Sequence, residues 1–177
     1  MKSLYQDIRN KLETDISGIH VRLWNNQILY SDEGQQIPFN FPAVFIDFPV
    51  IEWGQMGKGI QNADRLVVRL YICSQSYNTS ENEEDLEIFD LRENVFYSVQ
   101  DLKPTDAGKL QRVAEQTDPK HTNIYVWVMD FITNYQDRVA ENPRNSQEAT
   151  IETLTLTTDL QIDPNTVDGV RTDKEFD

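Results

Sequence analysis

Two apolar runs near the middle of the chain lack the alternation of a half-exposed strand. They are residues 42–48 (PAVFIDF) and 66–73 (LVVRLYIC), and both are rich in β-branched and aromatic side chains. That composition favours strands, and the missing alternation favours strands that are covered on both faces. Gly54, Gly57 and Gly59 lie between the two runs. The pattern predicts two central antiparallel strands joined by a long hairpin loop.

Two other stretches have the spacing of amphipathic helices. Residues 3–15 place Leu4, Ile8 and Leu12 on one stripe, and Ser3 is positioned to cap the helix start. Residues 85–102 predict the main helix of the fold. Its apolar stripe contains Ile88, Leu91, Val95, Val99 and Leu102, and Phe89 and Phe96 widen it.

Shorter patterns complete a sheet. Residues 19–24 alternate and predict a strand with one wet face, and residues 27–30 predict a short return strand. Residues 110–116 and 123–133 predict a second hairpin, although only the latter has a strong strand pattern. The predicted fold class is α+β: a mainly antiparallel sheet with the long helix packed on one face, a short N-terminal helix and a long β-hairpin loop.

The composition changes after the last predicted strand. Residues 137–147 are polar and contain Pro143, which indicates a linker. Residues 149–162 alternate apolar side chains with threonines, and the chain then becomes acidic up to residue 177. We therefore predict one α+β domain over residues 1–136, followed by residues 137–177 as a linker and an extended acidic C-terminal arm with a strand-like segment.

Charge narrows the classes of partner. The 177 residues carry a net charge of −14, with a pI of about 4.4. Such a chain repels the phosphates of nucleic acids and the surfaces of anionic membranes. No run of about 18 apolar residues is present, and the first residues lack the basic-then-apolar pattern of a signal peptide. We expect no membrane partner and assembly in a cytoplasm.

The residue types that carry chemistry do not form a recognisable site. Cys73 lies in an apolar run, where a buried thiol is expected, and His20 and His121 lack the spacing of a zinc site. The glycines of residues 54–59 lack the Gly-Lys-Ser/Thr ending of a phosphate loop, and the acidic residues 81–85 are explained by a helix start. We expect no catalytic residue, no metal and no cofactor, and an enzyme that uses paired carboxylates stays as an alternative.

Trp53 and Met56 stand beside the predicted hairpin loop. One interpretation is that Trp53 caps the core. The other is that the loop is a contact surface for another subunit, because exposed aromatic and methionine side chains are enriched at such surfaces.

The succession of elements resembles the tail terminator and tail-completion proteins of long-tailed bacteriophages. The resemblance covers about residues 1–136 and is carried by the N-terminal helix, the strand at residues 41–46 (FPAVFI), the hairpin of residues 53–72, the helix at 85–102 and the strand at 123–132. It implies a structural virion protein without catalytic residues. Such proteins form a ring, usually a hexamer, that sits on the last ring of the tail tube, ends tube growth and joins the tail to the neck or connector.

The resemblance also sets the expected partners: copies of the chain itself, the tail tube protein, the neck or connector proteins and, in a contractile tail, the sheath. DNA is expected to pass through the acidic lumen without specific binding. We expect contacts between subunits at the hairpin and at the C-terminal segment, which adds a strand to a neighbouring chain. The residues assigned to these contacts are Trp53, Met56, Lys58, Ile60, Ile151, Leu154 and Leu156. Two alternatives remain, namely another neck or head-completion adaptor ring and an acidic DNA mimic that inhibits a nucleic-acid enzyme.

Overall fold

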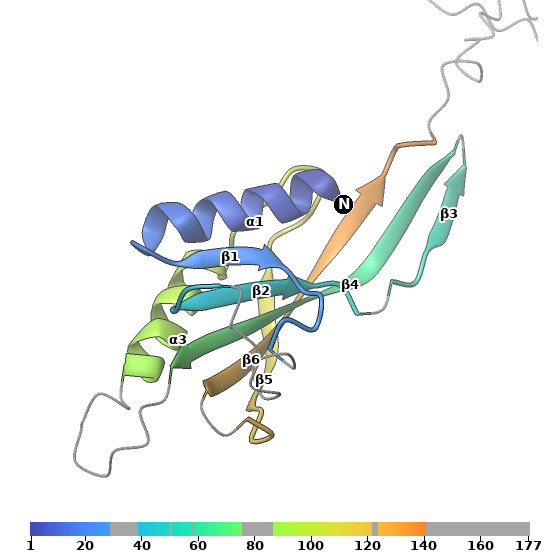
Figure 1. The fold of residues 1–177 in the computed structure, drawn as a ribbon. Coiled ribbons are helices and arrows are strands. Elements are labelled where there is room, and N and C mark those ends of the chain that lie inside the picture. Colours follow the sequence, from blue (N-terminus) through green and yellow to red (C-terminus); the bar gives the residue numbers. More distant parts are fainter. Residues whose placement is uncertain (29–38, 50, 58, 76–86, 122–123, 141–177) are drawn as a thin grey trace, which may run out of the picture. The chain divides into compact units, whose positions relative to one another are not determined.

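The structure, a computed structural model, describes residues 1–28, 39–49, 51–57, 59–75, 87–121 and 124–140. Within these residues the fold is α+β, with two helices and a mixed six-stranded sheet (Figure 1). The elements follow in the order α1 (Lys2–Asp15), β1 (His20–Leu23), β2 (Ala43–Asp47), β3 (Gly54–Gly57), β4 (Ile60–Gln75), α3 (Glu87–Val99), β5 (Gln111–Thr117) and β6 (Ile124–Asp137). The sheet order is β1-β2-β4-β6-β5, and β3 pairs with the start of β4. The predicted α+β class is confirmed.

The two central runs of the sequence become β2 and β4. They pair antiparallel from Ala43 opposite Cys73 to Asp47 opposite Arg69, as predicted. β4 pairs along its other edge with β6, so β4 is a central strand of the sheet. Its side chains alternate between the two faces, and apolar residues occupy both, which explains why the sequence shows no alternation.

The expectation of a mainly antiparallel sheet misses one pairing, because β1 runs parallel to β2. The return strand predicted at residues 27–30 is not present where the structure describes it. Gln27 and Ile28 lie in a turn, and residues 29–30 lie outside the described residues. Parallel neighbours need a connection of a dozen or more residues, which residues 24–42 supply.

One cluster of buried side chains lies between the helices and the sheet. α1 contributes the predicted stripe of Leu4, Ile8 and Leu12, all fully buried. The remaining members from α3 and the two longest strands are Ile88, Leu91, Val95, Val99, Leu66, Val68, Leu70, Ile72, Met129 and Phe131. Burial of apolar area on this scale is the main favourable term in folding.

Both helices differ from prediction at their ends. α1 begins at Lys2 with Met1 as its N-cap and has no side-chain cap, so the assignment of Ser3 as the cap is wrong. Ser3 lies inside the first turn, where it interacts with the Tyr135 hydroxyl on β6. α3 ends at Val99, and Leu102 lies half-buried beyond it.

A second cluster, rich in aromatic rings, lies on the opposite face of the sheet. Its buried members are Ile28, Phe39, Ala43, Phe45, Cys73, Ile124, Val126 and Val128. Trp24 stacks on Tyr71 with ring centroids 4.1 Å apart, and Phe39 meets Phe45 edge-on at 4.9 Å. Aromatic pairs in such geometries are worth about 0.5–1.5 kcal/mol beyond the area they bury.

The predicted second hairpin is confirmed, since β5 and β6 pair antiparallel. β5 is an edge strand among the described elements, and six of its seven residues are exposed, which explains its weak pattern. β6 runs four residues past the predicted end at Thr133, so that Asp137, placed in the linker by the prediction, still belongs to a strand. Residues 141–177, which include most of the predicted C-terminal arm, lie outside the described residues.

We predict that Phe131→Ala lowers the free energy of unfolding by about 3–5 kcal/mol, because it empties a fully buried site between the helices and the sheet. Urea unfolding of the full-length chain, followed by tryptophan fluorescence, measures the change. Val139→Ala is the control, since Val139 is 92% exposed, and we expect a change within about 0.5 kcal/mol. Equal stabilities of the two variants would contradict this description of the core.

Candidate functional site

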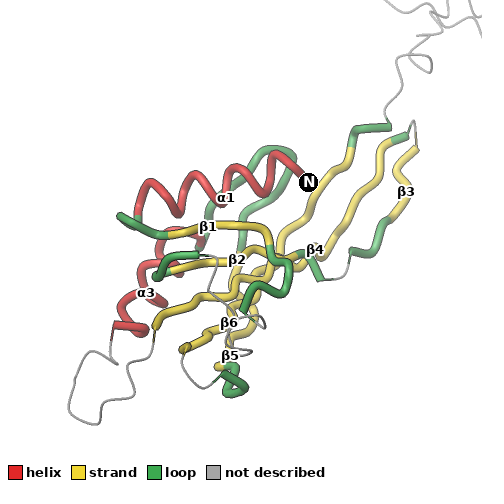
Figure 2. The backbone as a smooth tube through the Cα atoms, viewed as in Figure 1, coloured by secondary structure: helices red, strands yellow, loops and turns green. Residues whose placement is uncertain are grey.

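Part of the sheet extends beyond the cover of the helices. The pairing of β4 with β6 shifts register between Ala63 and Leu66, and past this shift β4 is flanked by β3 and the end of β6. Figure 2 shows these three strands running together beyond the two helices. We call this part the arm: β3, residues 60–63 of β4 and residues 135–137 of β6.

The arm has little apolar cover. All four residues of β3 are exposed, and Ile60, Gln61 and Asn62 at the start of β4 are only partly buried. Gly57 and Gly59 have φ values of 88° and 80°, a backbone conformation that permits the tight reversal between β3 and β4 and that other residues rarely adopt. A small group of strands without a buried face is only marginally stable in water, so the arm is the best candidate for a surface that a partner covers.

Three of the predicted contact residues lie on or beside the arm. Met56 is 59% exposed, Ile60 is partly buried and Trp53, just before β3, is 36% exposed. The Trp53 ring also meets Tyr135 edge-on at 6.1 Å, so this side chain both covers the base of the arm and reaches solvent. The other predicted contact residues, Lys58, Ile151, Leu154 and Leu156, lie outside the described residues.

The base of the arm is tied to the N-terminus. The amino group of Met1 donates a hydrogen bond to the Tyr135 hydroxyl. Burial raises the pKa of Tyr135, and the nearby Asp137 carboxylate adds to the rise, so this hydroxyl stays protonated at neutral pH. The start of α1 therefore holds β6 at the point where the arm leaves the core.

The loop that contains Asp106 and Gly108 also supports β6. The Gly108 amide donates to the Asn134 carbonyl at 2.9 Å, and the Gln136 amide donates to the Asp106 carbonyl at 2.9 Å. A Cβ at position 108 would overlap the Asn134 side-chain oxygen, so a larger residue there would displace that side chain.

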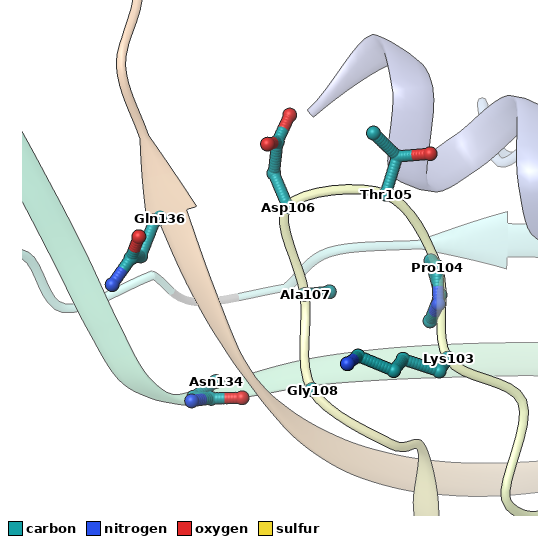
Figure 3. A pocket seen from close by; sticks show the side chains of 8 residues that line it. All are labelled: Lys103, Pro104, Thr105, Asp106, Ala107, Gly108, Asn134 and Gln136. Carbon is teal, nitrogen blue, oxygen red and sulfur yellow. The ribbon is translucent and has the colours of Figure 1, made fainter.

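An open hollow of about 540 Å³ lies at this loop. Figure 3 shows Asn134 and Gln136 projecting from β6, while the Lys103 side chain reaches across the loop and the Asp106 carboxylate points away from it. The lining residues form no pair of carboxylates and include no histidine or cysteine. The hollow is therefore best explained as a by-product of the loop that braces β6.

A second exposed surface was missed by the sequence analysis. Phe89 was assigned to the buried stripe of the main helix, but its side chain is 48% exposed and its ring meets Trp127 edge-on at 5.7 Å. Tyr97, two turns further along α3, is 75% exposed. The sequence contained a signal for this, because Glu93 stands four residues from each aromatic ring and places all three residues on one helical row.

Charged contacts hold this side of α3 against the sheet. Arg92 donates to both carboxylate oxygens of Glu115 on β5, at 2.6 and 2.8 Å, and Arg112 donates to the same carboxylate at 3.0 Å. Arg112 also lies 3.9 Å from the centre of the Phe96 ring, and Arg92 lies 5.7 Å from that of Trp127. The arginines of this network are therefore engaged with the protein itself.

Cys73 and His20, the remaining candidates for chemistry, lie among apolar and aromatic side chains. Cys73 is buried in the second cluster, and burial raises the pKa of its thiol far above the usual range. Burial also lowers the pKa of His20, with Arg22 adding to the effect, and the imidazole stacks on Phe39 at 6.1 Å. No group of three or more potential metal ligands occurs in the described part of the chain.

Comparison with known protein families gives no match, and comparison with curated proteins gives none either. Neither described helix is long and apolar enough to cross a lipid bilayer. The surfaces of the fold that bear on function are therefore the arm and the exposed row of α3, residues Phe89, Glu93 and Tyr97.

We predict that Cys73 does not react with a thiol reagent at pH 8 in the native protein, because its burial and raised pKa keep the reactive thiolate scarce and inaccessible. Absorbance with Ellman's reagent measures the reaction over an hour. In a denaturant the single thiol of the chain should react at once, which serves as the control. Rapid labelling of the native protein would contradict the buried placement.

Proposed function

We propose that the chain is a structural subunit of a ring at the head-proximal end of a phage tail. The ring ends growth of the tail tube and joins the tail to the neck or connector. The observation that carries the proposal is the arm, a three-stranded extension of the sheet that exposes Met56 and part of Trp53 and that only an assembly would cover.

The finer architecture belongs to the same proposal. The main helix packs on one face of the sheet, and the long hairpin of each subunit contacts its neighbour. The C-terminal segment that follows β6, up to residue 177, is extended, and its strand-like part pairs with another copy. A ring needs two different, complementary surfaces on each chain, because head-to-tail contacts close only when one patch meets another. The arm supplies one such surface.

The negative charge of the chain suits a channel for DNA. A net charge of −14 on each subunit is multiplied by the number of copies in the ring. A lumen of that sign repels the phosphate backbone, so the genome passes without adhering. The negative charge thus supports a channel that does not bind DNA and argues against a nucleic-acid-binding protein.

We predict that the purified chain assembles into rings and that Met56→Asp prevents this while leaving the fold intact, since the new charge lies on an exposed arm residue. Analytical ultracentrifugation and negative-stain micrographs measure assembly, and circular dichroism checks folding. Leu23→Asp on β1 is the matched control, because Leu23 is 53% exposed, similar to Met56.

Three outcomes count against the proposal or part of it. A chain that stays monomeric at high concentration and binds a basic nucleic-acid enzyme identifies a DNA mimic instead. Loss of assembly in both variants assigns the effect to added charge rather than to the arm. A ring that binds a portal or connector but no tail tube identifies a head-completion adaptor.

We further predict that deletion of residues 147–177 weakens assembly of the ring but leaves the melting temperature of the isolated chain unchanged. The reason is that the described fold, including both buried clusters, is complete without these residues. Thermal melting and sedimentation of the truncated chain make the comparison. Unchanged assembly after the deletion would remove the C-terminal segment from the interface.

A further inference from the structure

We propose that the tip of the arm in one copy, at Met56 and Ile60, docks on the exposed row of α3 in the next copy, at Phe89, Glu93 and Tyr97. The inference rests on the proposed ring and names the two surfaces that meet in it. Each surface is built from described residues of this chain, and the partner is a second copy of the chain.

The two surfaces lie at opposite ends of one ladder. β4 and β6 pair from Gln61 opposite Asp137, in the arm, to Gln75 opposite Ile124. The second end adjoins the start of α3, where Glu87 and Asp90 line a hollow together with Ser74 and Gln75. Figure 1 shows the arm and α3 at opposite ends of the long strands.

This separation excludes a contact within one chain. At about 3.3 Å per residue, the 16 residues of β4 span roughly 50 Å, so the tip of the arm cannot reach α3 of its own copy. A contact between two different ends repeats from copy to copy. Such a head-to-tail contact builds a closed ring when the rotation between copies allows it.

The receiving surface is aromatic and acidic. Phe89, Glu93 and Tyr97 stand four residues apart and therefore line up along one side of α3. Asp90, three residues before Glu93, is exposed beside them, whereas Glu87 faces the hollow at Ser74 and Gln75. The positive charge of Arg92 is taken up by the Glu115 carboxylate, so the carboxylates of this side of the helix are Asp90 and Glu93.

The docking surface has the opposite character. In a chain of which 26% is charged and the net charge is −14, residues 53–63 contain no acid, and the acid of the arm is Asp137, opposite Gln61 on β6. Arg138 follows directly after β6, next to the pair of Gln61 and Asp137. Met56 is flexible and polarisable, and methionine sulfur makes favourable contacts with aromatic rings.

The two surfaces are thus complementary in both charge and chemistry. The β3–β4 turn, where residues 53–63 contain no carboxylate, meets a row that presents Glu93, and an exposed methionine meets two exposed aromatic rings. Complementary charges of this kind set the register and the rate of association. A foreign partner is not needed, because this chain carries both halves of the contact.

The test is a charge exchange in the full-length chain. Met56→Glu places an acid on the tip, and Glu93→Lys places a base on the receiving row. We expect each single variant to raise the protein concentration needed for assembly by at least about tenfold, equivalent to roughly 1.4 kcal/mol per contact. Sedimentation velocity measures assembly, and circular dichroism verifies that each variant is folded.

Combining the two substitutions, in one chain or by mixing the two single variants, identifies the contact. In the double variant, and in an equimolar mixture of the two single variants, the substituted tip can meet the substituted helix, and assembly should return. Glu13→Lys on α1 is the matched control for charge, since it makes the same change on the other helix, and it should assemble as the unaltered chain does. Higher salt should reduce the differences between variants.

The outcomes separate this inference from the proposed function. If the unaltered chain assembles and Glu93→Lys assembles equally well, the ring stands and α3 is not its receiving surface. Single variants that fail and do not recover on mixing also overturn the inference, because they then act at separate contacts. If the unaltered chain never assembles, the proposed function falls and this inference falls with it.

Discussion

The rest of the structure depends on the antiparallel pairing of β4 with β6. These are the two longest strands, and their ladder continues, with one register shift, from the arm to the opposite end of the sheet. The middle of the ladder carries side chains of both buried clusters, one on each face. Because β2 and β5 attach to its two edges, the ladder also sets the order of the sheet. One pairing therefore creates the core and, by running past it, creates the arm.

The change from core to arm begins at the register shift between Ala63 and Leu66, and Ala63 and Tyr135 on the arm side are the last buried residues of the core cluster. Leu66 is fully buried under the helices, whereas Asp64 and Arg65 within the shift are exposed. A shift of this kind increases local twist and frees a strand to leave the plane of the sheet. Tyr135 accepts a hydrogen bond from the N-terminal amino group and packs against Trp53, so it fixes β6 at the base of the arm. The arm is thus anchored at its base and uncovered at its end, as expected of an element that completes its packing in another molecule.

Sequence reasoning succeeds where burial dictates composition. β4 and β6 were predictable because strands covered on both faces require continuous apolar runs, and α1 because Leu4, Ile8 and Leu12 share one stripe. It failed where the hydrophobic pattern gives neither the direction of a strand relative to its neighbour nor the surroundings of a helical side chain. An apolar run does not reveal that β1 lies parallel to β2, and helical spacing alone placed Phe89 in the core although the edge of the sheet leaves it half exposed. At the candidate site, Trp53 and Met56 were found from their position beside glycines, whereas the α3 row needed the three-dimensional placement of the helix.

A chain with a net charge of −14 would be expected to repel its own copies, so self-association needs a physical reason. Screening is the first reason, because at physiological ionic strength a charge is felt over only about 8 Å, far less than the roughly 50 Å length of β4. Repulsion between copies is then decided by the residues that meet, and the net charge of the whole chain matters little. The uneven distribution of charge is the second reason: carboxylates are absent from residues 53–63, whereas the exposed row of α3 presents Glu93. The acidity of the chain is therefore compatible with the proposed contacts between copies, each of which joins a tip to a helix.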